Sequence, residues 1–559
     1  MHQNKHFRGT MDHMNLAYQL LQATTPLAQL LLLVPLLLLL GHSISRGRHG
    51  SKKQRPKRCL PPSPPGLPII GHLHLVSDLP HVSLRGLAAK HGGGGLAAKH
   101  GGGGLMLLRF GTVRSLVVSS PQAAQLVLRT QDHAFASRPA SKVADVLFYG
   151  STDIGFSPYG EHWRQLRKLI TTHLLSIKKV NSNRDARHDE VRLVMEKIRE
   201  VAAAAKAVDI SEAMNTFAND IVCRAVSGKF FRAEGRNKLF RELIEANTRM
   251  IDGFNLEEYF PGVAKALGSL TGWFTSNKAD EARKRWDGLL ETIITDHEGR
   301  RRSSEHGHVA GGVEQEESDF IDVLLSVQKE YGITRDHIKA ILMDMFGAGT
   351  DTSSLVLELA MAELMRNPQL MTKLQAEVRV NTPRGQQMVA QDDIASMTFL
   401  RAVVKETLRL HPPAPLLLPH LAMVECEVDG YTIPEGTRVI INEWAIGRDP
   451  ESWEKPEQFM PERFTEGGSA AAIDFRGNDF QFVPFGAGRR ICPGLNFGMA
   501  TVEIMLANLV YCFDWELPAG MKKEDIDLTE VFGLTVHPKQ KLVLVPKLRA
   551  IGAHALQAE

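Results

Sequence analysis

One cysteine of this chain lies in a loop rich in glycine and arginine, between a predicted strand over residues 480–483 and an apolar helical pattern over residues 495–509. The adjacent charges of Arg489 and Arg490 and the start of the helix are expected to favour the thiolate form of Cys492 over the thiol. The glycines allow the backbone to approach a flat ligand closely. A thiolate held by backbone N–H groups suits a haem iron as its axial ligand, so the loop predicts haem ligation.

Two other interpretations of the loop compete with haem ligation. A strand followed by Gly-Ala-Gly could open a dinucleotide-binding fold, but the third glycine would fall at Ile491 and no alternation of strands and helices surrounds it. An isolated cysteine such as Cys492 is also more often an inert core residue than a ligand. The cysteine alone does not decide between these interpretations, so the residues around it must.

The spacing around the cysteine resembles that of a known family. The frame Phe-x-x-Gly-x-Arg-x-Cys-x-Gly is complete in Phe485, Gly488, Arg490, Cys492 and Gly494. It resembles the cysteine-ligand loop of the cytochrome P-450 family, the haem-thiolate monooxygenases. The resemblance implies haem b bound through Cys492, O₂ as a substrate, and electrons from NADPH delivered by an NADPH–cytochrome reductase. Helical patterns with a few short strand pairs predict a mainly α fold with small β-sheets.

A second segment that could carry chemistry interrupts a long helical pattern. The apolar run over residues 338–346 breaks into small and polar residues at 347–353 and then resumes. A glycine inside a helix costs about 1 kcal/mol, and threonine hydroxyls can bend a helix by bonding back to its carbonyls. The alternative is a plain helix break with a new N-cap at Thr350 or Asp351.

The residues at this interruption are similar to the oxygen-binding helix of the same family. The matching residues are Ala348, Gly349, Asp351 and Thr352. The resemblance implies that the opened helix holds O₂ over the iron, while the acid and the hydroxyl relay protons to it. Cleavage of the O–O bond consumes protons, so an acid beside a hydroxyl makes chemical sense.

Glu406 and Arg409 lie three residues apart on a predicted helix and therefore share a face. A surface ion pair that contributes little to stability is the simplest interpretation. The pair also matches the Glu-x-x-Arg pair of the family, which forms a buried ion network with Arg463 behind the cysteine loop. We therefore expect these three residues to serve structure and haem incorporation.

Trp163 and Arg167 are four residues apart on another predicted helix. A structural cation–π pair is one interpretation. In the family this helix meets a haem propionate, for which a planar guanidinium is well suited, and Arg490 is expected to bind the other propionate. The family usually has a further arginine at the position of His420, where a neutral imidazole could donate one hydrogen bond.

The substrate pocket is expected to be formed by variable loops and helix faces near the iron. Its predicted lining residues are Val143, Phe148, Met345, Ala414, Leu416 and Leu534. None of them is charged, so a lipophilic substrate fits best. The residues around the motifs resemble the plant A-type, 71-clan-like branch of the family, whose hydroxylases act on terpenoids, indoles, phenolics or oximes. Among these classes the apolar lining favours a terpenoid.

A basic face is predicted on the thiolate side of the domain, formed by Arg164, Lys168 and Arg489, and is expected to dock the acidic reductase. Two alternatives to monooxygenation remain. A redox-neutral haem-thiolate isomerase or dehydratase would not need the proton-relay motif. A non-enzymatic membrane haem-binding protein would turn over no substrate.

Bulk composition is consistent with an intracellular cofactor enzyme. The 559 residues are more than enough to bury a large cofactor. A net charge of +3 gives no support for a nucleic-acid partner. The five cysteines form no C-x-x-C pair, which argues for free thiols in a reducing compartment and against a zinc site.

The N-terminal region predicts membrane attachment. Residues 27–40 are almost purely leucine and are followed directly by a cluster of lysines and arginines. The apolar run is shorter than the ~20 residues that span a bilayer, so a cleaved signal peptide is the alternative. Positive charge on the C-terminal side favours an uncleaved anchor with the following body in the cytoplasm. We expect a single-pass protein of the endoplasmic reticulum membrane.

The predicted organisation has five parts. They are a possible N-terminal extension (1–14), a membrane signal-anchor (15–41), a basic flank with a proline-rich hinge (42–71), a haem-thiolate catalytic domain (72–548) and a C-terminal tail (549–559). Within the domain, the duplicated unit at 87–104 predicts a helix end followed by a flexible insertion. The charged stretch at 300–317 predicts a solvated surface loop.

Overall fold

The computed structural model describes residues 59–92, 103–228, 231, 236–252, 256–262, 269–305 and 318–549. The predicted extension, the signal-anchor and most of the basic flank fall in residues 1–58, outside the described part. Most of the second repeat copy and nearly all of the C-terminal tail lie outside it as well. The description below therefore concerns the predicted catalytic domain and the end of the hinge.

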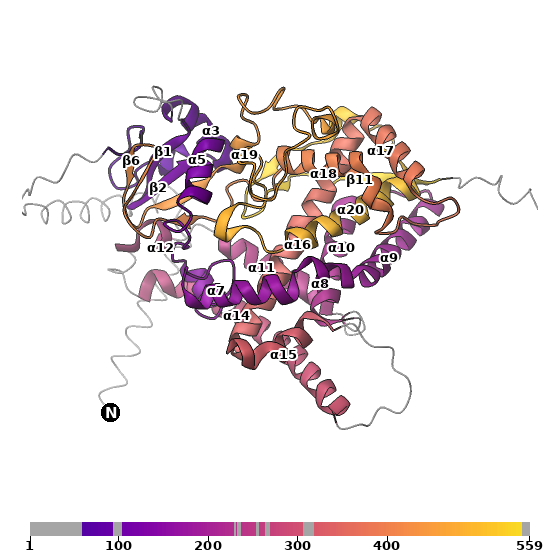
Figure 1. Ribbon diagram of the computed structural model, residues 1–559, viewed down its shortest axis with the longest axis horizontal. Helices are drawn as coiled ribbons and strands as arrows, with labels where there is room; N and C mark the ends of the chain where they lie inside the picture. The colour runs from indigo at the N-terminus through magenta and orange to yellow at the C-terminus, as the bar shows by residue number, and fades with distance from the viewer. Residues whose placement is uncertain are drawn as a thin grey trace, which may run out of the picture.

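The helical part is organised around α16 (Arg335–Arg366), which crosses the middle of the molecule (Figure 1). It packs against α10 (Ile210–Ser227), α18 (Thr398–Leu410) and α20 (Leu495–Cys512). Most of the side chains of α16 and α20 are buried. These helices therefore owe their stability chiefly to tertiary packing.

Further helices surround this core. The longer ones are α9 (Arg184–Ala203), α11 (Arg236–Asp252), α14 (Ser269–Glu305), α15 (Phe320–Tyr331) and α17 (Pro368–Asn381). The shorter ones are α3 (Pro80–His91), α5 (Pro121–Gln125), α6 (Lys142–Leu147), α7 (Glu161–Leu169), α8 (Ile177–Ser182), α12 (Leu256–Tyr259) and α19 (Glu443–Ile446). Side-chain caps begin several of them, as where Ser141 accepts from the N–H of Ala144.

The small sheets are not grouped together: β1, β2 and β6 lie at the left of Figure 1, whereas β11 lies toward the right, near α17 and α20. The largest has the order β1-β2-β7-β4, from β1 (Leu105–Phe110), β2 (Val113–Val118), β7 (Arg438–Ile441) and β4 (His420–Leu421). The others pair β3 (Val208–Asp209), β11 (Val543–Leu548) and β8 (Phe513–Glu516), then β5 (Cys426–Val428) with β6 (Tyr431–Ile433), and β9 (Glu530–Val531) with β10 (His537–Pro538). The predicted mainly helical fold with small sheets is confirmed.

The predicted interruption at 347–353 does not break the helix. α16 continues through it without a new N-cap, so the alternative of a break at Thr350 or Asp351 is wrong. The hydroxyl of Thr350 donates to the carbonyl of Phe346 at 2.8 Å, and that of Thr352 donates to Ala348 at 2.7 Å. Burial of the helix on both sides outweighs the local cost of its glycines.

Two local predictions are wrong, and one is confirmed. Residues 480–481 form a turn and 482–483 have no regular structure, so the predicted strand is absent; none of the described strands pairs with them, and Phe482 N–H donates to the carbonyl of Asp479 at 2.9 Å. The start of the predicted loop at 300–317 is helical, because α14 extends to Glu305. In the first repeat copy, α3 ends at His91, as its four-glycine run requires.

Among the described helices, α20 is long and apolar enough to span a bilayer. Nearly three quarters of its span is buried inside the protein, however, and it packs on α16, α17 and α9. α20 is therefore a core helix, whose apolar sequence reflects burial on all sides.

Candidate active site

The cysteine loop is a tight turn that leads into α20. The backbone N–H of Cys492 donates to the carbonyl of Phe485 at 2.9 Å and closes the loop. Gly488 has φ +66°, and a Cβ there would lie 1.9 Å from the carbonyl oxygen of Leu128, so only glycine fits. Gly494 is the N-cap of α20, and a Cβ on it would lie 3.8 Å from the cysteine Sγ. Loop geometry thus explains the glycine frame found in the sequence.

The environment of Cys492 differs from the one predicted. Burial raises the pKa of the thiol, while the N–H groups of Gly494 and Leu495 and the charge of Arg167 act in the opposite direction. The guanidinium of Arg489 is partly exposed and pairs with Asp132 at 3.2 Å. The expectation that the two adjacent arginines favour the thiolate is therefore wrong, because their side chains bond elsewhere.

Arg490 is bonded to backbone carbonyls. Its guanidinium donates to Ala136 at 2.6 Å, to Ile154 at 3.2 Å and to Ser157 at 2.6 Å. It also lies 4.1 Å from the ring centroid of Trp163. The cation–π partner of the tryptophan is therefore Arg490, and the one predicted four residues along α7 is not observed.

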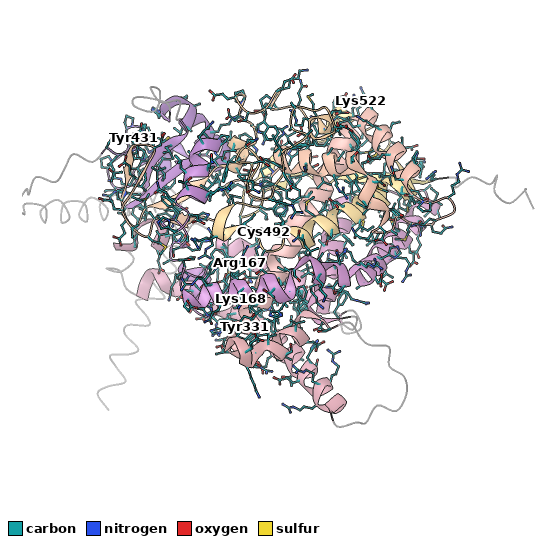
Figure 2. All side chains as sticks on the ribbon, in the orientation of Figure 1. Arg167, Lys168, Tyr331, Tyr431, Cys492 and Lys522 are labelled. Atoms are coloured by element: carbon teal, nitrogen blue, oxygen red, sulfur yellow. The ribbon has the colours of Figure 1, made fainter. Side chains whose placement is uncertain are left out.

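The other cation on this side of the loop is Arg167 on α7. Figure 2 shows Arg167 and Lys168 below Cys492, in the middle of the molecule. The guanidinium of Arg167 is half-buried and contributes an electrostatic interaction with the cysteine. Within the described residues it has no hydrogen-bond partner or ion pair of its own. A half-buried, unpaired guanidinium beside the candidate iron ligand suits an anionic group of a cofactor.

Arg138 was not singled out from the sequence. It is buried, and it donates to the carbonyls of Leu418 at 2.7 Å, Pro419 at 2.9 Å and Gly155 at 3.0 Å. Its only sequence signal is a charged residue within a stretch that is otherwise small and apolar.

His420 cannot serve as the propionate donor that the sequence suggested. Its Nδ1 lies 2.8 Å from the carbonyl oxygen of Phe135, which can only accept, so the ring hydrogen is on Nδ1. Burial, followed by the nearby charge of Arg138, lowers the pKa of His420 to about 3. The ring is therefore neutral, and its Nε2 carries a lone pair that cannot donate to a carboxylate.

α16 supplies the acid and the hydroxyl of the predicted proton relay. Burial raises the pKa of Asp351, with a smaller contribution in the same direction from Glu245 and an opposing one from His537. A protonated acid is the form that can deliver a proton. A Cβ on Gly349 would lie 2.8 Å from Val222 Cγ2 on α10, so close helix packing accounts for this glycine.

Ala348 is exposed although it lies in the middle of a helix whose neighbouring turns are buried. Cys492 is likewise only half-buried. A flat apolar group bound at the cysteine sulfur would cover it, and Arg167 beside the sulfur would meet a negative charge of that group. The residues present therefore fit haem b, with Cys492 as the metal ligand.

The predicted ion network is observed. Arg409 donates from Nε and Nη2 to the two carboxylate oxygens of Glu406 at 2.7 and 2.8 Å, and Arg463 Nε lies 3.0 Å from Glu406 Oε1. The three side chains are at most 1% exposed. Both arginines also donate to the carbonyl of Gln458. The network ties α18 to the segment that precedes the cysteine loop.

The predicted pocket residues lie on separate elements. Val143 is in α6, Phe148 is its C-cap and Met345 is in α16, and all three are buried. Ala414, Leu416 and Leu534 lie on connections and are half-buried. Their role as a pocket lining stays a prediction.

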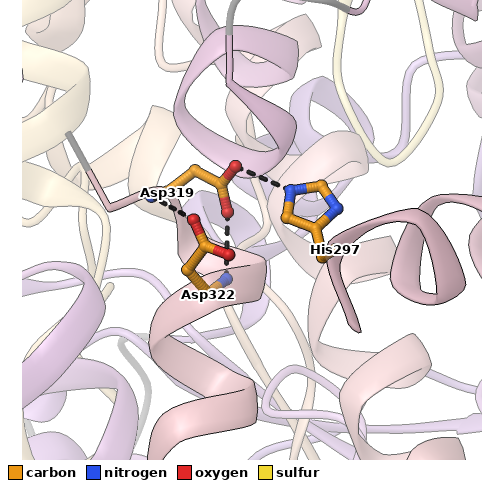
Figure 3. Close-up of side chains that lie close together, drawn as sticks. All are labelled: His297, Asp319 and Asp322. Carbon is orange, nitrogen blue, oxygen red and sulfur yellow. Dashed lines mark hydrogen bonds and ion pairs between the residues drawn. The ribbon is translucent and has the colours of Figure 1, made fainter. Parts of the chain in front are cut away.

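A second cluster of possible metal ligands lies away from the cysteine loop, where α14 meets the start of α15. His297, Asp319 and Asp322 meet there (Figure 3). His297 Nε2 is 2.7 Å from Asp319 Oδ2, and the two aspartates form the capping box of α15. Burial lowers the pKa of His297, but the hydrogen bond with Asp319 opposes this effect, and the pKa is raised overall. The contacts are those of a helix cap and an ion pair, so the cluster is structural.

Comparison with known proteins places these features in context. The family model described as Cytochrome P450 matches residues 61–545. Over 487 residues the chain is 54% identical to an indole-2-monooxygenase of Zea mays, with 87% of each chain covered. It is 51% identical over 530 residues to an indolin-2-one monooxygenase of Zea mays, covering 93% of this chain and 95% of the relative. A zebra fish cytochrome P450 structure with abiraterone matches with a TM-score of 0.65 and 25% identity, covering 85% of this chain and all of that one.

Proposed function

Because this chain belongs to the cytochrome P450 family and is a plant monooxygenase of its 71 clan, we propose that its substrate is a small heterocycle of the indole class. The single observation that carries the proposal is identity of 54% and 51% to two monooxygenases named for indole and indolin-2-one. The enzyme uses haem b, O₂ and electrons supplied through a reductase. Monooxygenation is thereby preferred to the redox-neutral and non-enzymatic alternatives.

The terpenoid preference rested only on the apolar character of the predicted lining. Val143, Phe148 and Met345 are buried and apolar, and they would accept a flat aromatic skeleton as readily as an aliphatic one. Phe148 stacks on Phe156 with ring centroids 5.4 Å apart, so an aromatic surface is already formed beside α6. Indole needs only one hydrogen-bond acceptor for its N–H, which the backbone can supply.

When bound, haem b supplies the iron on which O₂ is reduced and activated. Cys492 would hold the iron through its sulfur, and the N–H groups of Gly494 and Leu495 would stabilise negative charge on that sulfur. Arg167 would offer its guanidinium to an acidic side chain of the cofactor. From α16, Asp351 and Thr352 would hold and deliver protons.

The direct experiment is expression of the full chain in microsomes with a plant reductase, NADPH and either indole or indolin-2-one. We expect a product heavier by one oxygen atom, and that atom should come from labelled O₂. Turnover of terpenoids with none of either heterocycle would contradict the proposed substrate class and leave monooxygenation intact.

Asp351→Asn is expected to reduce the rate of product formation by about 10²-fold, the usual contribution of one positioned acid. Because oxygen activation lacks its proton, more of the NADPH consumed should appear as peroxide. The measurement is the amount of product and the amount of peroxide formed per NADPH consumed. Asp336→Asn, on the exposed first turn of the same helix, is the control and should behave as wild type. If both variants form the same amount of product per NADPH consumed, the proposed proton relay is contradicted.

We also propose attachment to the endoplasmic reticulum membrane by the N-terminal anchor and docking of an NADPH–cytochrome reductase on the cytoplasmic side. Of the predicted basic face, Arg164 pairs with Glu161 and Arg489 pairs with Asp132. Lys168 is exposed and forms no ion pair within the described residues. Lys168 is therefore the cation of this face most available to an acidic partner.

Lys168→Glu is expected to slow electron transfer from the reductase severalfold at low salt, with the difference shrinking as salt screens the charges. Stopped-flow reduction under carbon monoxide measures this rate. Lys197→Glu, on the exposed face of α9, makes the same charge change at a distance and should have little effect. Equal rates for both variants would place the docking face elsewhere.

A further inference from the structure

Two carboxyl groups with no assigned role meet between α16 and the segment 153–157, part of the connection from α6 to α7. Asp153 is fully buried in that segment. Asp344 is half-buried on α16, four residues before Ala348. The two carboxyl groups lie close together, with Asp153 Oδ2 at 3.2 Å and Asp344 Oδ1 at 3.5 Å from the position of a Cβ on Gly155, and, besides burial, Asp153 raises the pKa of Asp344 through its charge and a hydrogen bond. A contact between two carboxyl groups needs a proton between them, since two carboxylates can only accept.

The N–H side of the segment faces these carboxyls. Ile154 N–H donates to Asp344 Oδ2 at 2.7 Å, and Phe156 N–H donates to Asp153 Oδ2 at 2.7 Å. The N–H of Gly155 also bonds to the pair. A Cβ on Gly155 would lie 3.2 Å from Asp153 Oδ2 and 3.5 Å from Asp344 Oδ1, so the backbone rests directly on both acids.

The C=O side of the same segment faces two guanidinium groups. Arg490 donates to the carbonyls of Ile154 and Ser157, at 3.2 and 2.6 Å. Arg138 donates to that of Gly155 at 3.0 Å. Acids on one side and cations on the other thus hold the intervening peptide groups in a single orientation. Any shift of the acids passes through the peptide groups to Arg490, two residues from the iron ligand.

Burial, the dominant cause, raises the pKa of Asp153 to about 6. Burial also raises the pKa of Asp344 well above its ordinary value, and the charge of Asp153 adds to this effect. The other titratable or charged groups that face the pair or its segment are Arg138, Arg490, neutral His420, and His162, whose Nε2 is 3.1 Å from the carbonyl of Thr152. The pair therefore carries one negative charge beside two cations, and it keeps one proton at neutral pH.

We propose that Asp153 and Asp344 are positioning residues that share one proton, hold the segment 153–157 against α16, and thereby place Arg490 and Arg138 behind the cysteine loop. The pair acts on haem retention and takes no part in the chemistry. The raised pKa values of the two acids set the sign of the pH effect. An acid with a raised folded-state pKa stabilises most when protonated, so the contribution is lost as the pH rises through that pKa.

The test follows haem transfer from the detergent-solubilised full-length holoenzyme to excess apomyoglobin, from mildly acidic to alkaline pH. The wild-type protein is expected to release haem faster as the pH rises. If one proton is lost, the release rate can increase by at most about tenfold per pH unit. In Asp153→Asn and in Asp344→Asn the amide supplies the hydrogen bond without a titrating proton, so the rise should flatten. If haem release from both variants still accelerates with pH as it does in wild type, the proposal is wrong.

Two control variants separate the pair from other acids. Asp145→Asn, exposed on α6, should keep the wild-type rise. Glu358→Gln removes another buried acid of α16, whose pKa is raised to about 7 by burial, so it titrates in the same range. If Glu358→Gln alone flattens the rise, the pH dependence belongs to that residue and the proposal is overturned.

Two further measurements keep the proposal testable if the asparagine variants do not fold. Gly155→Ala keeps both acids but places a methyl group against them. The increase in haem-release rate should then occur at a different pH. An increase at the wild-type pH would count against the pair. Infrared pH-difference spectra of wild type should show a protonated carboxyl band that disappears over the range in which haem release accelerates. Absence of that band overturns the shared proton. Neither readout depends on the substrate, so failure of the indole assignment leaves them unaffected.

Discussion

Replacing Cys492 by alanine is expected to abolish the red-shifted Soret band that the reduced, carbon monoxide-bound protein shows when sulfur ligates the iron. Alanine removes the only sulfur that the loop places beside Arg167 and the N–H groups of Gly494 and Leu495. Because the iron then lacks its protein ligand, monooxygenase activity should fall to background. Carbon monoxide difference spectra of microsomes, normalised to protein by immunoblot, measure the loss.

The matched control for this prediction is Cys426→Ala. Cys426 is another partly buried thiol, on β5, in the small hairpin that it forms with β6. This variant should keep the full band, so any loss in Cys492→Ala cannot be ascribed to removing a thiol as such. A thiolate-type band retained in Cys492→Ala would overturn the assignment of the iron ligand, and with it the role given to the whole loop.

Replacing Glu406 by alanine is expected to cost about 3–5 kcal/mol of folding free energy, the range found when one partner of a buried ion network is removed. Arg409 and Arg463 are at most 1% exposed, and both would lose their carboxylate while remaining inside the protein. Their remaining bonds, to carbonyls such as Gln458, do not compensate charge. We therefore expect little folded holoprotein at growth temperature.

Chemical unfolding of the detergent-solubilised protein, followed by haem absorbance, measures this loss. Glu462→Ala is the matched control, because Glu462 pairs with Lys373 at 2.8 Å and both side chains are more than 40% exposed. An exposed pair contributes only about 0–1 kcal/mol. Similar losses in the two variants would show that burial of the Glu406 network is not what makes it important.

Several elements could be read from sequence because their signals are local. The glycine frame of the cysteine loop reflects backbone conformation, as the positive φ of Gly488 shows. The hairpin of β5 and β6 follows from Asp429 and Gly430, a residue pair typical of a tight turn between two strands. The Glu406–Arg409 pair follows from helical spacing. In each case the residues that decide the structure are close together along the chain.

Other features could not be read in this way. Local propensity opposes a helix over 347–353, and only packing on α10 and α20 maintains it. The spacing of His420 suggests a propionate donor, but contact of its Nδ1 with the carbonyl of Phe135, 285 residues away, excludes that role. Asp153 and Asp344 gave no signal at all, because they are 191 residues apart and meet only in the folded chain.

The sequence by itself determined the family frame, the candidate iron ligand and most of the helices, because these depend on side-chain type, short spacing and backbone freedom. Tertiary structure decided which cation meets which group: Arg489 turns to Asp132, Arg490 to three carbonyls and Trp163, and Arg167 to the neighbourhood of Cys492. An arginine has several donors and a long flexible stem, so its partner is selected by whichever unpaired acceptors packing brings within reach. That selection depends on distant segments.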